Sequence, residues 1–123
     1  MQTNKLDQMI EILKKDLGEA LITANIWDIG NGKTLATYNG QPRTVSVLNR
    51  VTNFVVNALK DSDLPDLEGY YTLNLANRKY ALVLPLNSYR LGLLVDMEKI
   101  EVGLLLNVTL PKIMDTYEET TGK

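Results

Sequence analysis

The chain has 123 residues, a formal charge of −2, and neither cysteine nor histidine. Its 45% apolar content suits a packed core, whereas the two absent residue types exclude disulfides, thiolate nucleophiles, a Ser-His-Asp triad and cysteine or histidine metal ligands. Its 13 basic and 15 acidic residues lack the basic excess of a nucleic-acid-binding protein. We therefore predict one domain over residues 1–123, with its core at about 4–118, a polar tail at 119–123, and no nucleic-acid partner.

The N-terminal segment predicts a helix over about Asn4–Leu17, with Gly18 in the place of a C-terminal cap. Its apolar residues recur at helical spacing on one face, and they are Leu6, Met9, Ile10, Leu13 and Leu17. The segment has no signal-peptide core, and no apolar run approaches the roughly 18 residues of a membrane span. The expectation is a cytoplasmic protein without a membrane span.

A hairpin is predicted next, from the strands Ala20–Asp28 and Lys33–Tyr38. Asn31-Gly32 between them is typical of a type I′ turn, in which both central residues have positive φ. Gly30–Thr34 looks like the end of a phosphate-binding P-loop, but it lacks the first glycine and precedes a strand rather than a helix. Trp27, the only tryptophan, is interpreted as a packing residue of the core or of a subunit contact.

The segment from Arg43 or Thr44 to Lys60 predicts the second long helix. Its apolar residues form two overlapping stripes, which together are wider than one sheet face needs. The stripes consist of Leu48, Val51, Val55 and Leu59, and of Val47, Val51, Phe54 and Ala58. Two interpretations stay open: the spare stripe packs against a second chain, or the helix is enclosed within its own domain.

Three strands follow, at Tyr70–Ala76, Tyr80–Leu86 and Tyr89–Asp96. A final helix is predicted from Glu98 or Glu101 to Glu118, kinked or split by Pro111, which lacks a backbone donor. The order α-β-β-α-β-β-β-α predicts an α+β fold, a five-stranded antiparallel sheet with helices on its faces.

No catalytic, cofactor-binding or metal site is predicted. Asp61, Asp63 and Asp66 lack the glycine and glutamate of a calcium-binding loop. Asp96 and Glu98 stand where the last strand meets the last helix, where acids commonly complement the helix dipole.

Arginines are weighed separately, because an arginine from a partner protein can accelerate GTP hydrolysis. The chain has Arg43, Arg50, Arg78 and Arg90, and each is interpreted as a solvated surface charge before any catalytic role. Arg43, at the start of the second helix, and Arg50, on its outer side, are the candidates for binding a partner.

The element order and three short segments resemble a known family. The segments are Gly18–Ile22 entering the first strand, Asn31–Ala36 across the hairpin, and Val102–Leu105 entering the last helix. Over about Leu6 to Tyr117 the chain resembles the roadblock/LC7 domain, a dimer-forming relative of the profilin-like and longin group.

The resemblance implies a homodimer or heterodimer in which the second helices, here Arg43–Lys60, pack together and the third strands, here Tyr70–Ala76, pair. The dimer-interface candidates are Val47, Val51, Phe54, Val55, Ala58, Tyr71 and Leu73. It also implies a non-enzymatic regulator or scaffold beside a Ras-like small GTPase, with no catalytic residue set and no cofactor.

Three alternatives remain open from the sequence. A sensory module of the PAS or GAF kind would hold a small ligand inside a similar sheet-and-helix fold. A dynein-light-chain type of adaptor would share the roadblock fold. A small enzyme would need a carboxylate- or lysine-based site, which the sequence does not signal.

Overall fold

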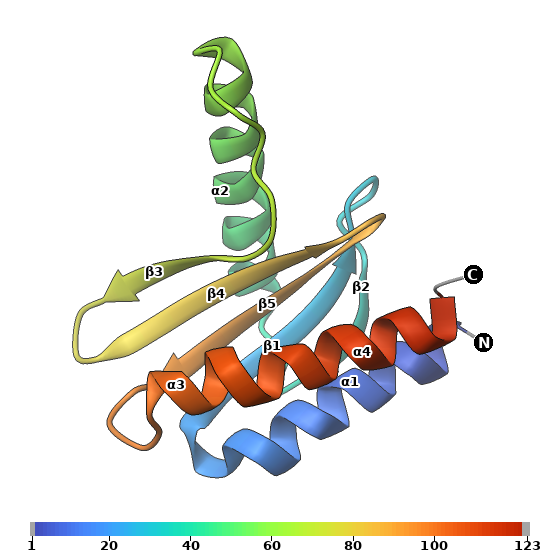
Figure 1. Ribbon diagram of the computed structural model, residues 1–123, viewed down its shortest axis with the longest axis vertical. Coiled ribbons are helices and arrows are strands. Elements are labelled where there is room, and N and C mark those ends of the chain that lie inside the picture. The colour runs from blue at the N-terminus through green and yellow to red at the C-terminus, as the bar shows by residue number, and fades with distance from the viewer. Residues whose placement is uncertain (1, 122–123) are drawn as a thin grey trace.

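The computed structural model describes the backbone of residues 2–121 and the side chains of residues 5–118. Within these residues one antiparallel sheet has the strand order β2-β1-β5-β4-β3, with helices on both of its faces (Figure 1). The predicted α+β fold and element order are confirmed. The elements are α1 (Gln2–Leu17), β1 (Leu21–Asp28), β2 (Thr34–Tyr38), α2 (Pro42–Asp61), β3 (Tyr71–Leu75), β4 (Lys79–Leu86), β5 (Tyr89–Asp96), α3 (Val102–Leu104) and α4 (Leu110–Thr121).

Local residues set the ends of the long helices. Gly18 follows α1 with a φ of 53°, as predicted for a cap glycine. Pro42 opens α2, where its missing N–H costs nothing. Beyond α2, Asp63 has a φ of 58° and the Leu64 N–H donates to the Leu59 carbonyl at 3.0 Å, which closes the helix in a Schellman-type cap.

The β1–β2 connection differs from the prediction. The prediction of a type I′ turn at Asn31-Gly32 is wrong, because Gly32 has a positive φ but Asn31 does not. The loop is longer than a two-residue turn: the Gly32 N–H donates to the Asp28 carbonyl at 2.8 Å, and the Asp28 N–H donates to the Lys33 carbonyl at 2.9 Å. The Asp28 side chain reorganises the loop further, since its Oδ1 accepts the Gly30 N–H at 2.7 Å.

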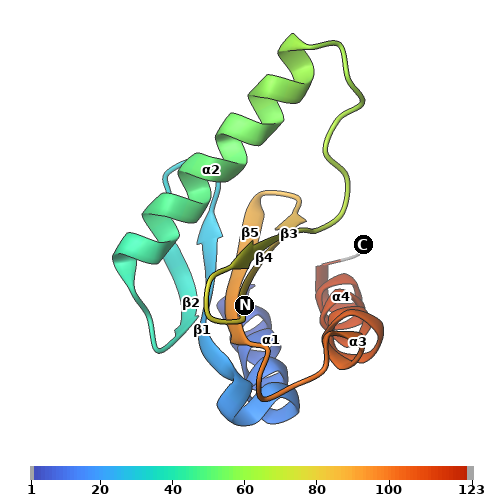
Figure 2. The same cartoon turned by 90° about the vertical axis from the view of Figure 1, so that its left-hand side faces the viewer.

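The two faces of the sheet carry cores of different size. α1 and α4 lie side by side on one face, while α2 stands on the other (Figures 1 and 2). The face under α1 and α4 holds the main apolar cluster, which includes Leu6, Met9, Leu13, Ile26, Leu82, Leu91, Leu93, Leu105 and Ile113. The face under α2 holds a small cluster formed by Trp27, Val45, Leu48 and Val83, with Tyr71 packed against it.

The C-terminal helix is interrupted just before Pro111. A π-helical turn, Leu105–Thr109, separates α3 from α4, and the Leu110 N–H donates to the Leu105 carbonyl five residues earlier. Proline has no backbone N–H to donate, and in a regular α-helix its ring collides with the carbonyl four residues before it. The wider π-helical turn accommodates Pro111. The predicted kink or split is confirmed. α4 also continues to Thr121, beyond the expected end at Glu118, and the rest of the expected tail lies outside the described residues.

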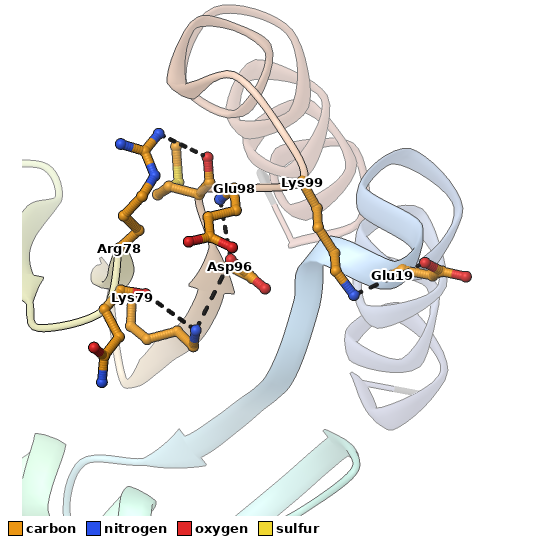
Figure 3. Close-up of polar contacts among 8 residues, drawn as sticks. Glu19, Arg78, Lys79, Asp96, Glu98 and Lys99 are labelled. Atoms are coloured by element: carbon orange, nitrogen blue, oxygen red, sulfur yellow. Dashed lines mark hydrogen bonds and ion pairs between the residues drawn. The ribbon is translucent and has the colours of Figure 1, made fainter.

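Charged side chains hold together the start of β4, the end of β5 and the adjoining turn and loop (Figure 3). The Lys79 Nζ lies 3.9 Å from the Asp96 Oδ1, and that same carboxylate oxygen accepts the Glu98 N–H at 3.0 Å. Arg78 donates to the Met97 carbonyl at 3.3 Å. Asp96 therefore organises a turn, and the expected role of Asp96 and Glu98 at a helix start is wrong, because α3 begins only at Val102 and has no acidic residue in its first turn.

Asp16 fastens α1 to the C-terminal helix. Its Oδ2 accepts a hydrogen bond from the Lys112 Nζ at 2.7 Å and another from the Thr109 Oγ1 at 3.1 Å. The bond from Lys112 is the main reason that the pKa of the Asp16 carboxyl lies below its ordinary value, although burial opposes the shift. The ionised carboxylate is thus the form that stabilises the fold.

We expect Asp16→Asn to lower the free energy of unfolding by about 1 kcal/mol at pH 7, discounted because Lys112 is half exposed. A carboxyl with a depressed folded pKa contributes stability above its unfolded pKa of about 3.9, and that stability disappears as the pH falls through the lower folded pKa. Urea unfolding of both proteins at pH 7 and in strong acid measures the difference, which should vanish in acid. An equal difference at both pH values would contradict the role of the charge.

Candidate functional site

α2 presents three different flanks along its length. The flank facing the sheet is buried and carries Val45, Leu48 and Thr52. Thr52 donates to the Leu48 carbonyl at 2.7 Å, so the Tyr71 hydroxyl, 2.6 Å away, must donate to the Thr52 Oγ1. This contact joins α2 to β3, and the other two flanks remain open.

The second flank is apolar and exposed. The Phe54 side chain is 73% exposed and Val47 is 44% exposed, while Val51, Val55 and Ala58 are half-buried. The interpretation in which α2 is enclosed within its own domain is therefore wrong for this chain by itself. The C-terminal half of α2 even projects clear of the sheet (Figures 1 and 2).

A groove of about 300 Å³ runs between this apolar flank and the sheet. Its lining is almost entirely apolar and includes Val47, Val51, Leu73, Leu75 and Ala81. β3 is an edge strand of the sheet, so its outer backbone N–H and C=O groups have no partner strand among residues 2–121. The residues named for a dimer interface from the sequence thus lie on two adjacent surfaces, α2 and β3.

The sheet under the third flank of α2 is polar and carries a buried network. Arg90 of β5 is only 6% exposed, and its guanidinium donates to the Asn49 Oδ1 at 2.8 Å and to the Asn53 Oδ1 at 2.9 Å. The Trp27 Nε1–H donates to the same Asn49 oxygen at 2.8 Å. Burial lowers the pKa of Arg90, and the nearby Tyr71 partly offsets the shift.

The interpretation of Arg90 as a solvated surface charge is wrong. The register pairs Arg90 with Trp27 across β5 and β1, on the face that α2 covers. Two signals in the sequence point toward this network: an arginine inside an otherwise apolar strand, and asparagines at i and i+4 on the second helix. Neither signal says that the two segments meet.

The other arginines are exposed as expected, but they lie in different places. Arg50 lines a second pocket, of about 410 Å³, between the polar flank of α2 and the β1–β2 loop. Arg43 lines the apolar groove instead, and Arg78 lies in the β3–β4 turn. The two candidates for partner binding therefore line different pockets beside α2.

Among the described side chains, those of residues 5–118, no cluster of three acidic groups is arranged to hold a metal ion. The same part of the chain contains no helix that is both long and apolar enough to cross a membrane.

By sequence, the chain matches no protein-family model and no curated protein. By structure, it is similar to Myxococcus xanthus MglB, with a TM-score of 0.78 and 13% identity over 98% of this chain and 90% of that chain. A roadblock/LC7 domain from Streptomyces avermitilis aligns with a TM-score of 0.66 and 10% identity, over 95% of this chain and 98% of that chain. A structure described as MglB with a tetrameric arrangement aligns with a TM-score of 0.68 and 14% identity, over 94% and 91% of the two chains.

These alignments extend over nearly the whole chain at sequence identities of 10 to 14%. They agree with the sheet order and with the expectation from the short sequence segments. The chain has the roadblock/LC7 fold.

Proposed function

We propose that this protein is a dimeric, non-enzymatic regulator that binds a Ras-like small GTPase in the cytoplasm and modulates its nucleotide cycle. The observation that carries the proposal is the apolar surface of α2 and β3, left exposed on a roadblock/LC7 fold. An exposed apolar patch on one helix and one sheet edge is typical of a surface that binds protein.

The first partner in this proposal is a second copy of the chain. Pairing of two β3 edges continues the sheet across the dimer and satisfies the backbone groups that β3 leaves open. The same approach brings the exposed flanks of two α2 helices together, burying Phe54 and Val47. The tetrameric arrangement of a similar MglB structure supports assembly through surfaces of this fold.

The roadblock/LC7 resemblance implies the second partner, a Ras-like small GTPase. The described residues offer no catalytic histidine or cysteine, and their exposed arginines are separated along the molecule. The regulator therefore acts by orienting the switch residues of the GTPase itself, with Arg43 and Arg50 contributing to binding. The continuous apolar cluster under α1 and α4 favours this surface role over a PAS- or GAF-like module that encloses its ligand.

The test uses Ras-like GTPases encoded in the same genome, loaded with GDP or with a non-hydrolysable GTP analogue. We expect binding to prefer one nucleotide state, and saturating regulator to change the single-turnover rate of GTP hydrolysis. Arg43→Gln and Arg50→Gln should each weaken binding about two- to fivefold and leave the saturated rate unchanged. The absence of binding in both nucleotide states would refute the proposal, and binding with an unchanged rate would indicate a scaffold.

A further inference from the structure

The pocket beside the polar flank of α2 has an unusual set of polar groups. It opens between this helix and the β1–β2 loop, and its volume of about 410 Å³ is that of a small-molecule site. Its polar lining comes from Thr34, Ser46, Asn49, Arg50 and Asn53, and no carboxylate lines it. The pocket is therefore rich in hydrogen-bond donors.

The two asparagines are held in one orientation by the network beneath them. Guanidinium and indole N–H groups can only donate, so the carboxamide oxygens of Asn49 and Asn53 must face Arg90 and Trp27. Neither Nδ2 group donates to a described residue, and no described side-chain nitrogen is sealed away without a partner. Both NH₂ groups are thus available to a ligand.

The charge of the site is uncompensated. Arg90 is only 6% exposed, whereas Arg50 is exposed. Neither arginine forms an ion pair with a described residue. Among the described residues, only the carboxamide oxygens of Asn49 and Asn53 accept hydrogen bonds from the Arg90 guanidinium. A buried cation without a counterion projects a positive potential into the adjacent opening, because its field is weakly screened there.

We propose that this pocket is a binding site for the phosphate group of a small molecule. Arg50 and the NH₂ groups of Asn49 and Asn53 would contact the oxyanion, and Arg90 would supply charge from beneath. Two guanidinium groups favour a doubly charged phosphate over a carboxylate. The donors are side chains of a helix flank, which distinguishes the site from a P-loop, where backbone amides at a helix N-terminus hold the phosphate.

The probes are inorganic phosphate and adenosine 5′-monophosphate, each titrated into ¹⁵N-labelled protein against sodium chloride at matched ionic strength. We expect saturable shifts of the Asn49 and Asn53 side-chain NH₂ signals and of the single indole N–H signal, which belongs to Trp27. Tighter binding of the nucleotide would assign the site to an organic phosphate, and equal binding would assign it to the free anion. Shifts that do not exceed those with chloride would overturn the proposal.

Three variants test whether the pocket is the site. Arg50→Gln should weaken phosphate binding at least about tenfold. Asn53→Asp should abolish it while raising the stability of the fold, because the new carboxylate pairs with Arg90 and repels the anion. Arg43→Gln is the matched control, since Arg43 lies on the same helix but outside the pocket, and it should leave the affinity unchanged.

An equal loss of affinity in Arg43→Gln and Arg50→Gln would show a response to net charge only, and it would overturn the assignment to this pocket. The titration contains no GTPase and does not require dimerisation. A titration without phosphate binding would therefore not contradict the proposed GTPase regulator. Equally, a protein that binds no GTPase could still bind phosphate in this pocket.

Discussion

Phe54→Asp is expected to convert the dimer into monomers. The Phe54 side chain is 73% exposed in the single chain, so its replacement removes few contacts from the folded protomer. The proposed dimer buries the Phe54 side chains of both protomers. Each buried aromatic side chain contributes about 1.5–3 kcal/mol to the free energy of dimerisation. The dissociation constant should therefore rise at least about a hundredfold, and the desolvation of two carboxylates would increase it further.

Analytical ultracentrifugation over a range of protein concentrations measures this change. Val108→Asp is the control, because Val108 is also apolar and 46% exposed but lies on the C-terminal helix, remote from α2. The control should remain a dimer, and both variants should unfold like the wild-type protomer once dilution has removed the dimer contribution. A wild-type protein that sediments as a monomer, or a Phe54→Asp dimer, would be incompatible with the proposed interface.

Gly92→Ala is expected to destabilise the fold by about 1–3 kcal/mol through overpacking beneath α2. A Cβ atom at this position would lie 2.8 Å from the Trp27 Cζ3 and 2.9 Å from the Leu48 Cδ1. Trp27 is fully buried and its indole is fixed by the hydrogen bond to Asn49, so the ring cannot move without breaking that bond. The added methyl group would therefore displace α2 from the sheet.

Chemical unfolding compares this variant with Gly103→Ala. The same substitution at Gly103 meets its nearest atom, the Asn107 Nδ2, at 3.8 Å and lies at an α-helical position, so it should be neutral or stabilising. Displacement of α2 would also open the pocket and the groove on its two flanks. If Gly92→Ala were as stable as the wild type, the close packing of α2 on the sheet would be contradicted.

The periodic elements were predictable because their signals are local. The helical spacing from Leu6 to Leu17 and the alternation in β5 follow from which side chains share a face, and the structure places both sets in the main core. Pro111 predicted an interrupted helix for a similarly local reason, the lack of one backbone donor. The loop after β1 escaped prediction because the Asp28 carboxylate, outside the Asn-Gly pair, accepts the backbone N–H groups of the loop.

The double apolar stripe of α2 is a feature whose pattern could be read from the sequence but whose packing partner could not. The sequence revealed more apolar surface than a sheet face needs, but it could not say whether another layer of the same chain would cover the excess. The structure leaves Phe54 and Val47 exposed because no other described element reaches that flank. The dimer candidates on it therefore remain a prediction whose test is assembly.

The clearest failure of prediction from sequence is Arg90. Arginine side chains are seldom buried, so Arg90 was expected at the surface. Its burial depends on contacts between segments far apart in the chain. Asn49 and Asn53 lie 41 and 37 residues away, and Trp27 belongs to the neighbouring strand β1. The elements, their order and the excess of apolar surface could be predicted from sequence, because those features depend on near neighbours. Which polar groups meet could be known only from the folded chain, because a buried charge is tolerated only where the packing of distant elements supplies its partners.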